Sequence, residues 1–262
     1  LPSLLCGSEG TLGIVTAARL RLVAAHQYTV TALVGFTDVE AAVDAAIHWR
    51  ASLDVLDALE IVLGDGVALV ASAFGYPLPF EQSCAAYVLV EASAHDDPMD
   101  RLGGVVADAT NVVDVAVASD GTRRAALWRY REEHTAAIGT VGVPHKFDVT
   151  VPLALLATFL ADVPGVVRSA VPDARTWLFG HVGDGNIHVN VTGVPASAPD
   201  LDDRVLAYVA SLGGSISAEH GIGTAKAPWL HLCRSADEIE TMRAIKRALD
   251  PDGVLNPNVL FG

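Results

Sequence analysis

Residues 178–191, LFGHVGDGNIHVNV, alternate polar and apolar side chains around an Asp-Gly pair, and this pattern constrains the fold more than any other stretch. Asp184-Gly185 is among the strongest signals for a two-residue hairpin turn, because it supplies the positive φ that a type I′ turn needs. With that turn, His181 lies opposite His188, and opposed side chains share one face with Cβ atoms roughly 4.5–5.5 Å apart. This separation suits two imidazoles that share one metal ion.

The two faces of this hairpin differ in character, because side chains alternate between faces along a strand. One face is apolar throughout and should pack on a core: Leu178, Val182, Ile187, Val189 and Val191. The other face is polar: His181, Asn186, His188 and Asn190. An ordinary hairpin with a polar outer face has the same alternation, so both interpretations stay open on this stretch alone.

The composition indicates a globular chain with a sizeable core. The chain has 262 residues, of which 51% are hydrophobic, and no apolar run approaches the roughly 20 residues of a membrane span. Its formal net charge of −14 argues against nonspecific binding to nucleic acid or anionic membranes, which depends on clustered Lys and Arg. Three widely spaced cysteines, Cys6, Cys84 and Cys233, favour a reduced, cytoplasmic chain. Leu1 is not an initiator, so we expect a fragment of a longer protein.

Strand and helix patterns alternate along the chain. A closing strand pair is expected at 10–23, and further strands at 28–36, 58–64, 85–93, 111–119 and 146–152. Helices are expected at 38–52, 98–110, 122–138, 153–163, 201–213 and 236–250. Hairpin-like neighbours and short connections favour an α+β fold, an antiparallel sheet with helices packed on one side. No G-x-G-x-x-G follows a strand and no Walker sequence occurs, so neither kind of nucleotide site is supported.

A third metal ligand is available in SISAEHGIGTAK, residues 215–226. Sites with two histidines usually add another protein ligand, commonly a carboxylate, and Glu219 is the candidate. In a regular strand Glu219 and His220 would point to opposite faces. Both can serve one pocket only if the backbone departs from the strand, which Gly221 and Gly223 permit. A solvated turn is the alternative for this segment.

Two basic residues could hold an anionic group. On the expected helix 122–138, Arg131 and Thr135 share a face with apolar anchors, and a planar guanidinium suits a carboxylate. A structural ion pair is an equally good interpretation of Arg131, because acidic residues are plentiful. Lys146 alternates with Asp148 on one face of a strand, and a plain surface lysine is the alternative there.

Four stretches resemble, in the same order, the C-terminal half of the FAD-linked 2-hydroxy acid dehydrogenases. They are GSEGTLGIVT at 7–16, GHVGDGNIHVNV at 180–191, SAEHGIG at 217–223 and IKRALDPDGVLNP at 245–257. The family includes D-lactate dehydrogenase, the glycolate oxidase flavin subunit and D-2-hydroxyglutarate dehydrogenase. HKFDVTVP, LWRYREEHTAAI and SAEHG look most like the 2-hydroxyglutarate branch, since the D-lactate branch lacks the lysine at this point.

The resemblance implies a domain plan with FAD as a cofactor. Residues 1–25 would be the end of an FAD-binding domain, 26–235 the substrate- and metal-binding domain, and 236–262 a helical segment returning toward the flavin. FAD would be bound mostly by the part of that domain missing here. The resemblance adds contacts to FAD from Gly7, Ser8, Gly10, Thr11, Gly13, Ile14 and Asn256. The family often ends N-P-G-K, whereas Asn258 and Val259 stand here, so no role of that lysine is carried over.

The resemblance also implies residue roles and a reaction. The metal ligands, for a divalent ion such as Zn²⁺, would be His181, His188 and Glu219, and His220 would be the catalytic base. The substrate contacts would be Arg131, Thr135, Lys146 and Asn190. The implied reaction oxidises a small D-2-hydroxy acid to the 2-oxo acid with hydride transfer to FAD, which a further electron acceptor reoxidises. The fragment alone is expected to be inactive.

Three other functions are compatible with parts of this pattern. A D-lactate or glycolate dehydrogenase shares the family motifs. A non-catalytic domain could use the same ligands for a structural metal. Two histidines and a glutamate also serve zinc hydrolases, although the HExxH motif is absent.

Overall fold

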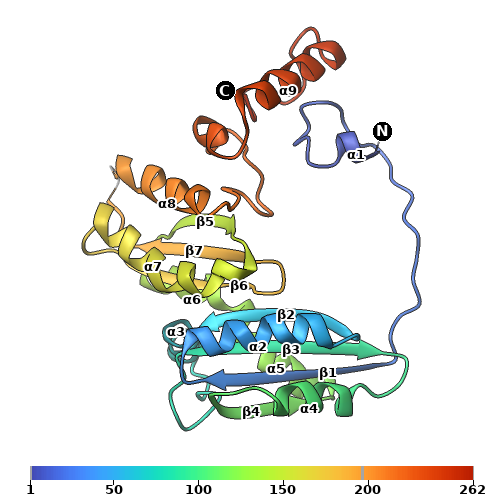
Figure 1. Ribbon diagram of the computed structural model, residues 1–262, viewed down its shortest axis with the longest axis vertical. Coiled ribbons are helices and arrows are strands. Elements are labelled where there is room, and N and C mark those ends of the chain that lie inside the picture. Colours follow the sequence, from blue (N-terminus) through green and yellow to red (C-terminus); the bar gives the residue numbers. More distant parts are fainter. Residues whose placement is uncertain (1, 196–197, 262) are drawn as a thin grey trace.

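One antiparallel sheet organises the molecule. The computed structural model describes residues 2–195 and 198–261, and its seven described strands run in the order β4-β1-β3-β2-β6-β7-β5 (Figure 1). The strands are β1 Tyr28–Phe36, β2 Leu56–Leu63, β3 Ala86–Ala94, β4 Val112–Ala118, β5 His145–Thr150, β6 Arg175–His181 and β7 Asn186–Thr192. Neighbouring strands pair antiparallel throughout this order. The expected α+β class and antiparallel sheet are confirmed.

Helices cover both faces of this sheet, whereas the sequence suggested one. They are α1 Pro2–Leu5, α2 Val39–Ser52, α3 Gly64–Phe74, α4 Met99–Ala107, α5 Gly121–Glu132, α6 His134–Val141, α7 Leu156–Ala170, α8 Pro199–Ser211 and α9 Ala236–Leu249, with short 3-10 turns at Leu153–Leu155 and Ala227–Leu232. The core on one face includes side chains of α2, α4, α7 and α8, and the core on the other includes those of α3, α5 and α6. Strand β3, AYVLVEASA, is buried at every position, so both of its faces need cover.

Helix boundaries follow local signals in most places. Asp38 caps α2 by accepting the backbone N–H of Ala41 at 2.8 Å. The expected helix 122–138 is instead two helices, with a break at Glu133. Helix α3 was not expected, because glycines obscure its pattern. One of them is required, since a Cβ at Gly66 would lie 2.2 Å from a ring nitrogen of His134.

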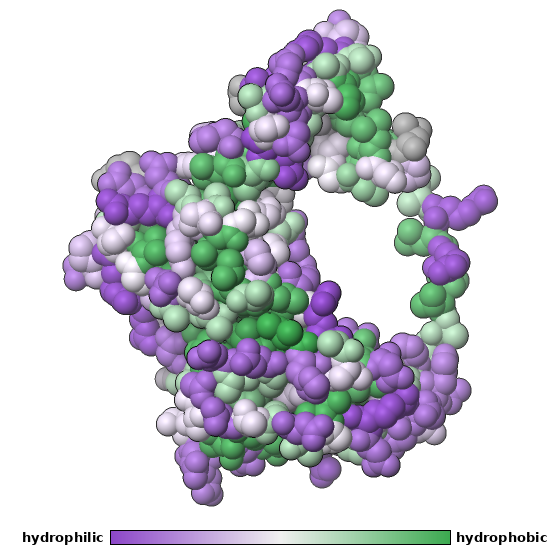
Figure 2. Space-filling model, viewed as in Figure 1, coloured by the Kyte–Doolittle hydropathy of each residue, from purple (hydrophilic) through white to green (hydrophobic). Residues whose placement is uncertain are grey.

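The expected strand pair at 10–23 is absent from the structure. These residues form neither helix nor strand, and Figure 2 shows the extended segment crossing open space. Its large apolar side chains are 69% to 90% exposed: Ile14, Val15, Leu20, Leu22 and Val23. A strand needs a hydrogen-bonding neighbour, and the described residues provide none for this segment.

One described helix has the length and composition of a membrane span. Residues 153–170 have a mean hydropathy of 1.5, which the sequence-based search for apolar runs overlooked. Only one side of the helix is buried, and its apolar side chains join the core on one face of the sheet: Leu156, Phe159, Leu160, Val163 and Val167. This packing is that of a core helix, and the helix also contains Asp162 and Arg168.

Candidate functional site

Strands β6 and β7 form the hairpin with a longer loop than the sequence suggested. Phe179, not His181, pairs with His188, so the register differs by two residues from the expected one. The N–H of Asp184 donates to the carbonyl of His181 at 3.3 Å, and within this loop only Gly185 has a positive φ, +78°. A type I′ turn needs two such residues, which explains the difference. A shift of two keeps each side chain on its expected face, and the two histidine rings lie 5.7 Å apart.

His181 is held by two carboxylates. Its Nδ1 hydrogen-bonds Oε1 of Glu60, a buried residue of β2, and its Nε2 lies 3.6 Å from Oε1 of Glu219. The hydrogen bond to Glu60 raises the pKa of His181, against the opposing effect of burial. Burial favours a higher pKa for Glu60, but bonds from His181 and Arg131 leave that pKa below its usual value. The second ring nitrogen of His181, Nε2, therefore faces Glu219, another of the predicted metal ligands.

His188 is oriented by Asp148, a buried residue of β5. Oδ1 of Asp148 lies 3.3 Å from Nδ1 of His188 and accepts the side-chain amide of Asn186 at 2.8 Å. Oδ2 accepts the backbone N–H groups of Glu219 at 2.6 Å and His220 at 2.8 Å. Burial alone would raise the pKa of Asp148, but these hydrogen bonds hold it well below the usual range.

Two overlapping groups of side chains could hold a metal ion. One is His181, His188 and Glu219, and the other is Asp148, His188 and His220; in each, the ligand atoms lie within 4.8 Å of one another. We favour the first, because both oxygens of Asp148 already accept hydrogen bonds. In the first group, Nδ1 of each histidine faces a carboxylate, so that Nε2 can bind the metal. Metal-bound histidines are commonly oriented in this way.

His220 lies beside this group without belonging to it. The His220 ring stacks on the His188 ring at a centroid distance of 6.0 Å, and His220 is exposed to solvent. The backbone leaves any strand here, with Gly221 at φ +76° and Gly223 at φ +58°. The irregular backbone that was expected to bring Glu219 and His220 to one site is therefore present.

Arg131 forms a buried ion pair. Its Nε lies 2.5 Å from Oε2 of Glu60, and its guanidinium lies over the Phe179 ring, 4.8 Å from the ring centroid. Glu60 bridges Arg131 to His181. The structural ion pair that the sequence left open is thus present, and the role of Arg131 toward substrate stays a prediction.

The other predicted substrate residues lie at different distances from the histidines. Lys146 pairs with Asn190 across β5 and β7, two residues along the strands from the pair Asp148 and His188. Asn190 is buried, whereas Lys146 is exposed at the edge of the sheet. Thr135 is exposed in the first turn of α6, and its hydroxyl has no hydrogen-bond partner among the described residues.

Most of the predicted flavin contacts lie in the N-terminal loop, and Asn256 of the C-terminal segment contacts this loop. Gly7 and Gly10 have φ of +78° and +75°, and Thr11 closes their loop by donating its hydroxyl to Ser8 O at 2.6 Å. Asn256 donates its side-chain amide to the carbonyl of Glu9. Gly13 and Ile14 follow in the extended segment, where Ile14 is 78% exposed. The resemblance implied that both segments lie near the flavin, and in the structure they contact one another.

Two buried carboxylates that organise the site escaped the sequence analysis. Strand β2 has the apolar sequence LDALEIVL. Beyond Asp57, near its start, Glu60 is its one charged residue. A charge in such a run usually has a buried partner, and this was the available signal. Asp148 alternates with Lys146 as expected, but nothing in the sequence indicated that β5 pairs with β7.

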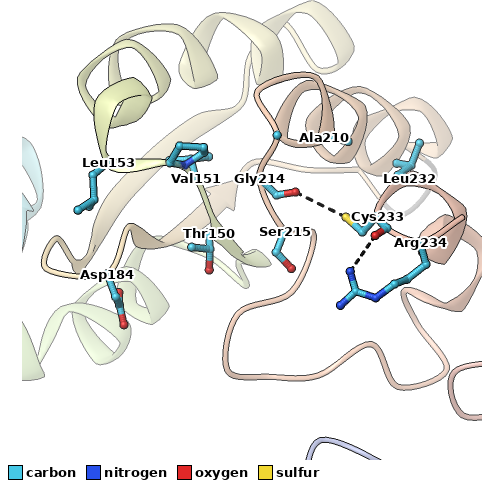
Figure 3. A pocket seen from close by; sticks show the side chains of 12 residues that line it. Thr150, Val151, Leu153, Asp184, Ala210, Gly214, Ser215, Leu232, Cys233 and Arg234 are labelled. Atoms are coloured by element: carbon cyan, nitrogen blue, oxygen red, sulfur yellow. Dashed lines mark hydrogen bonds between the residues drawn. The ribbon is translucent and has the colours of Figure 1, made fainter. Parts of the chain in front are cut away.

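The larger of two nearby cavities does not contain the histidines. It has a volume of about 610 Å³ and lies between the end of β5, the hairpin loop and the segment after α8. In Figure 3, Cys233 donates to the carbonyl of Gly214 and Arg234 to that of Cys233. A second cavity, about 380 Å³, is lined by Gly7, Glu9, Glu219 and His220, so it connects the N-terminal loop with the candidate base.

Comparisons with known proteins agree on the type of domain. Residues 25–260 match the family described as FAD linked oxidases, C-terminal domain. D-2-hydroxyglutarate dehydrogenase of Xanthomonas citri pv. viticola is 36% identical over 98% of this chain and 57% of its own length. The enzyme of that name from Stutzerimonas stutzeri is 32% identical over 100% of this chain and 58% of its own. This chain thus spans little more than half of these relatives.

A solved structure with low sequence identity has the same fold. The 4-ethylphenol oxidase of Gulosibacter chungangensis superimposes with a TM-score of 0.63 over 92% of this chain and 55% of the oxidase chain. The two sequences are 15% identical, so this likeness concerns the fold alone.

Proposed function

Because the chain belongs to the FAD linked oxidases, as their C-terminal domain, we propose that it is the substrate- and metal-binding part of a flavin-dependent dehydrogenase of D-2-hydroxy acids. Relatives named D-2-hydroxyglutarate dehydrogenase favour a dicarboxylic substrate similar to 2-hydroxyglutarate. The observation that carries the proposal is the convergence of His181, His188 and Glu219, with both histidines oriented by buried carboxylates.

The donor set fits a divalent ion such as Zn²⁺. His181, His188 and Glu219 would hold it, and two imidazoles with one carboxylate are ligands that zinc accepts while positions stay open for substrate. The ion, when bound, supplies a Lewis acid that polarises the substrate hydroxyl oxygen. Glu60 and Asp148 act in this scheme by keeping the Nε2 atoms of the two histidines available.

His220 is the proposed general base, because it adjoins His188 and imidazole is suited to accept a proton near neutral pH. Asp148 fixes the backbone on which His220 stands. The proton of the substrate hydroxyl would pass to the His220 ring, and the C2 hydride would be lost as the 2-oxo acid forms. FAD, held mostly by another domain in this scheme, supplies the hydride acceptor, and a separate electron acceptor reoxidises it.

The distal carboxylate of the substrate needs a cation, and we assign Lys146 to this role. It lies on the site face of β5 opposite Asn190, which we propose as a further substrate contact. Arg131 would contribute through the guanidinium atoms that Glu60 does not engage, with Thr135 nearby in the chain. A cytoplasmic location remains a proposal from cysteine usage alone.

Steady-state rates of the full-length flavoprotein on D-2-hydroxyglutarate, D-malate and D-lactate test the substrate class. We expect the two diacids to be preferred, and a clear preference for D-lactate would refute that choice. His220→Ala tests the catalytic role: turnover should be lost while bound metal is retained. Unchanged turnover with His220→Ala would refute His220 as the general base.

A further inference from the structure

Glu9 joins three segments that are far apart in the sequence. Its carboxylate accepts the backbone N–H of Ile222 through Oε1 and that of Gly223 through Oε2, each at 2.7 Å. Its carbonyl accepts a hydrogen bond from the Asn256 side chain, and the N–H of Leu260 donates to the carbonyl of Gly223 at 3.1 Å. Figure 1 shows the N-terminal and C-terminal elements together at one end of the molecule.

The backbone at this contact takes conformations that are unusual for a side chain other than glycine. Glu9 has φ +52°, in the left-handed region, which is unfavourable for a residue other than glycine. On the other side of the contact, Gly221 has φ +76°, and a Cβ there would lie 2.9 Å from Cδ of Glu9. A side chain at position 221 would therefore collide with Glu9, so the close contact needs the glycine.

Two carboxylates thus share the backbone of the loop that carries the candidate ligand and base. Asp148, in the sheet, accepts the N–H groups of Glu219 and His220, and Glu9, in the N-terminal loop, accepts those of Ile222 and Gly223. Because the side chains of Glu219 and His220 are exposed, their positions depend on these backbone contacts rather than on packing.

We propose that Glu9 is a positioning residue, which ties the loop of Glu219 and His220 to the N-terminal loop expected to contact the flavin. This inference rests on the proposed function. Glu9 touches neither substrate nor flavin in this role. It sets the place of the base and of one metal ligand relative to the domain that holds the hydride acceptor.

Glu9→Gln in the full-length flavoprotein tests the role, because an amide can accept only one of the two N–H groups. We expect amide exchange in residues 217–223 to become at least about tenfold faster, since the loop would open locally more often. The limiting rate of flavin reduction by D-2-hydroxyglutarate should fall at least about tenfold with little change in KM, as small misplacements of catalytic groups are costly. Glu81→Gln, at an exposed loop position, is the matched control and should behave as the unaltered protein.

Each result decides one part of the inference. If amide exchange in residues 217–223 is unchanged in Glu9→Gln, Glu9 does not hold the loop. If exchange is faster but the limiting rate of flavin reduction is unchanged, Glu9 does not position the catalytic groups. Glu9→Asp, whose carboxylate is one methylene group further from both N–H groups, is measured by the same criteria if Glu9→Gln does not fold. An unaltered flavoprotein without activity on any D-2-hydroxy acid would refute the proposed function, and exchange would still decide whether Glu9 holds the loop.

Discussion

The buried carboxylate of Asp148 accepts the backbone N–H of His220 at 2.8 Å, across 72 residues of sequence. The same side chain lies 3.3 Å from Nδ1 of His188. A single residue of β5 therefore orients a candidate metal ligand and the candidate base together. This arrangement explains how an exposed loop and a β-hairpin can contribute to one site.

Replacing Asp148 should disturb both partners at once. Asp148→Asn loses acceptor capacity and a charge beside His188, so we expect zinc affinity to fall about 10- to 100-fold. The free energy of unfolding should fall by on the order of 3 kcal/mol, because buried donors lose a charged acceptor. Zinc titration and urea unfolding measure the two effects. Asp184→Asn, in the exposed hairpin loop, is the control, and equal zinc affinity in both variants would argue against the role of Asp148.

Glu60 and Glu91 offer a matched pair of substitutions. Each is a buried glutamate bonded to an arginine of α5, Glu60 to Arg131 and Glu91 to Arg124 at 2.8 Å. Only Glu60 also bonds His181. Both Glu60→Gln and Glu91→Gln should lower the free energy of unfolding by roughly 3 kcal/mol, since each leaves a partly buried arginine without its counter-charge. Zinc affinity should fall about tenfold in Glu60→Gln alone; an equal loss in both would show a general effect of instability.

Lys146 should affect substrate selection and not metal binding. Lys146→Met removes the cation opposite Asn190, so we expect the KM for D-2-hydroxyglutarate to rise by at least about tenfold, the weight of one charge-assisted hydrogen bond. The KM for D-lactate, which has no distal carboxylate, should stay the same. Arg123→Met, at an exposed position of α5, is the control. A similar rise in KM for both substrates would show that Lys146 does not bind the distal carboxylate.

His134 should make stability fall in acid. Burial lowers the pKa of His134 to about 4, although its hydrogen bond to the Tyr130 carbonyl opposes the shift. The unfolded chain, with a histidine pKa near 6.5, therefore binds a proton first as pH falls. Between pH 6.5 and 4 this linkage removes on the order of 3 kcal/mol of stability.

Urea unfolding of the unaltered protein and His134→Phe at pH 7 and pH 4.5 isolates that contribution. The variant keeps a ring beside Phe179, where the histidine ring lies 4.9 Å away, but it has no group that titrates in this range. The unaltered protein should lose more stability than the variant between the two pH values. Equal losses would mean that His134 takes up its proton in the folded state.

Much of the fold could be predicted because its signals are local. Alternation of polar and apolar side chains indicated β7, and the expected strand 28–36 and helix 38–52 are β1 and α2. The faces of the hairpin were correct although its register was not, because a shift by two residues leaves the face of each side chain unchanged. The helix layer on the second face was missed, since a fully buried strand such as β3 has no alternation to indicate what covers it.

The metal ligands of the candidate site could be predicted from the sequence, but the buried carboxylates that orient them could not. The predicted ligands His181, His188 and Glu219 do lie together. Glu60 and Asp148 were missed because their roles depend on pairings between distant strands and segments, β2 with β6 and β5 with β7. Such contacts leave no local pattern in one sequence. The only local signal is the charge of Glu60 within the apolar strand β2.

Titration of Zn²⁺ into chelator-treated protein, followed by calorimetry, tests the central claim that the hairpin histidines and Glu219 hold one divalent ion. We expect one ion per chain, with affinity at least about tenfold weaker in Glu219→Gln, where a charged ligand is lost. His188→Ala should abolish specific binding. No binding by the unaltered protein, or unchanged binding in both variants, would contradict the claim.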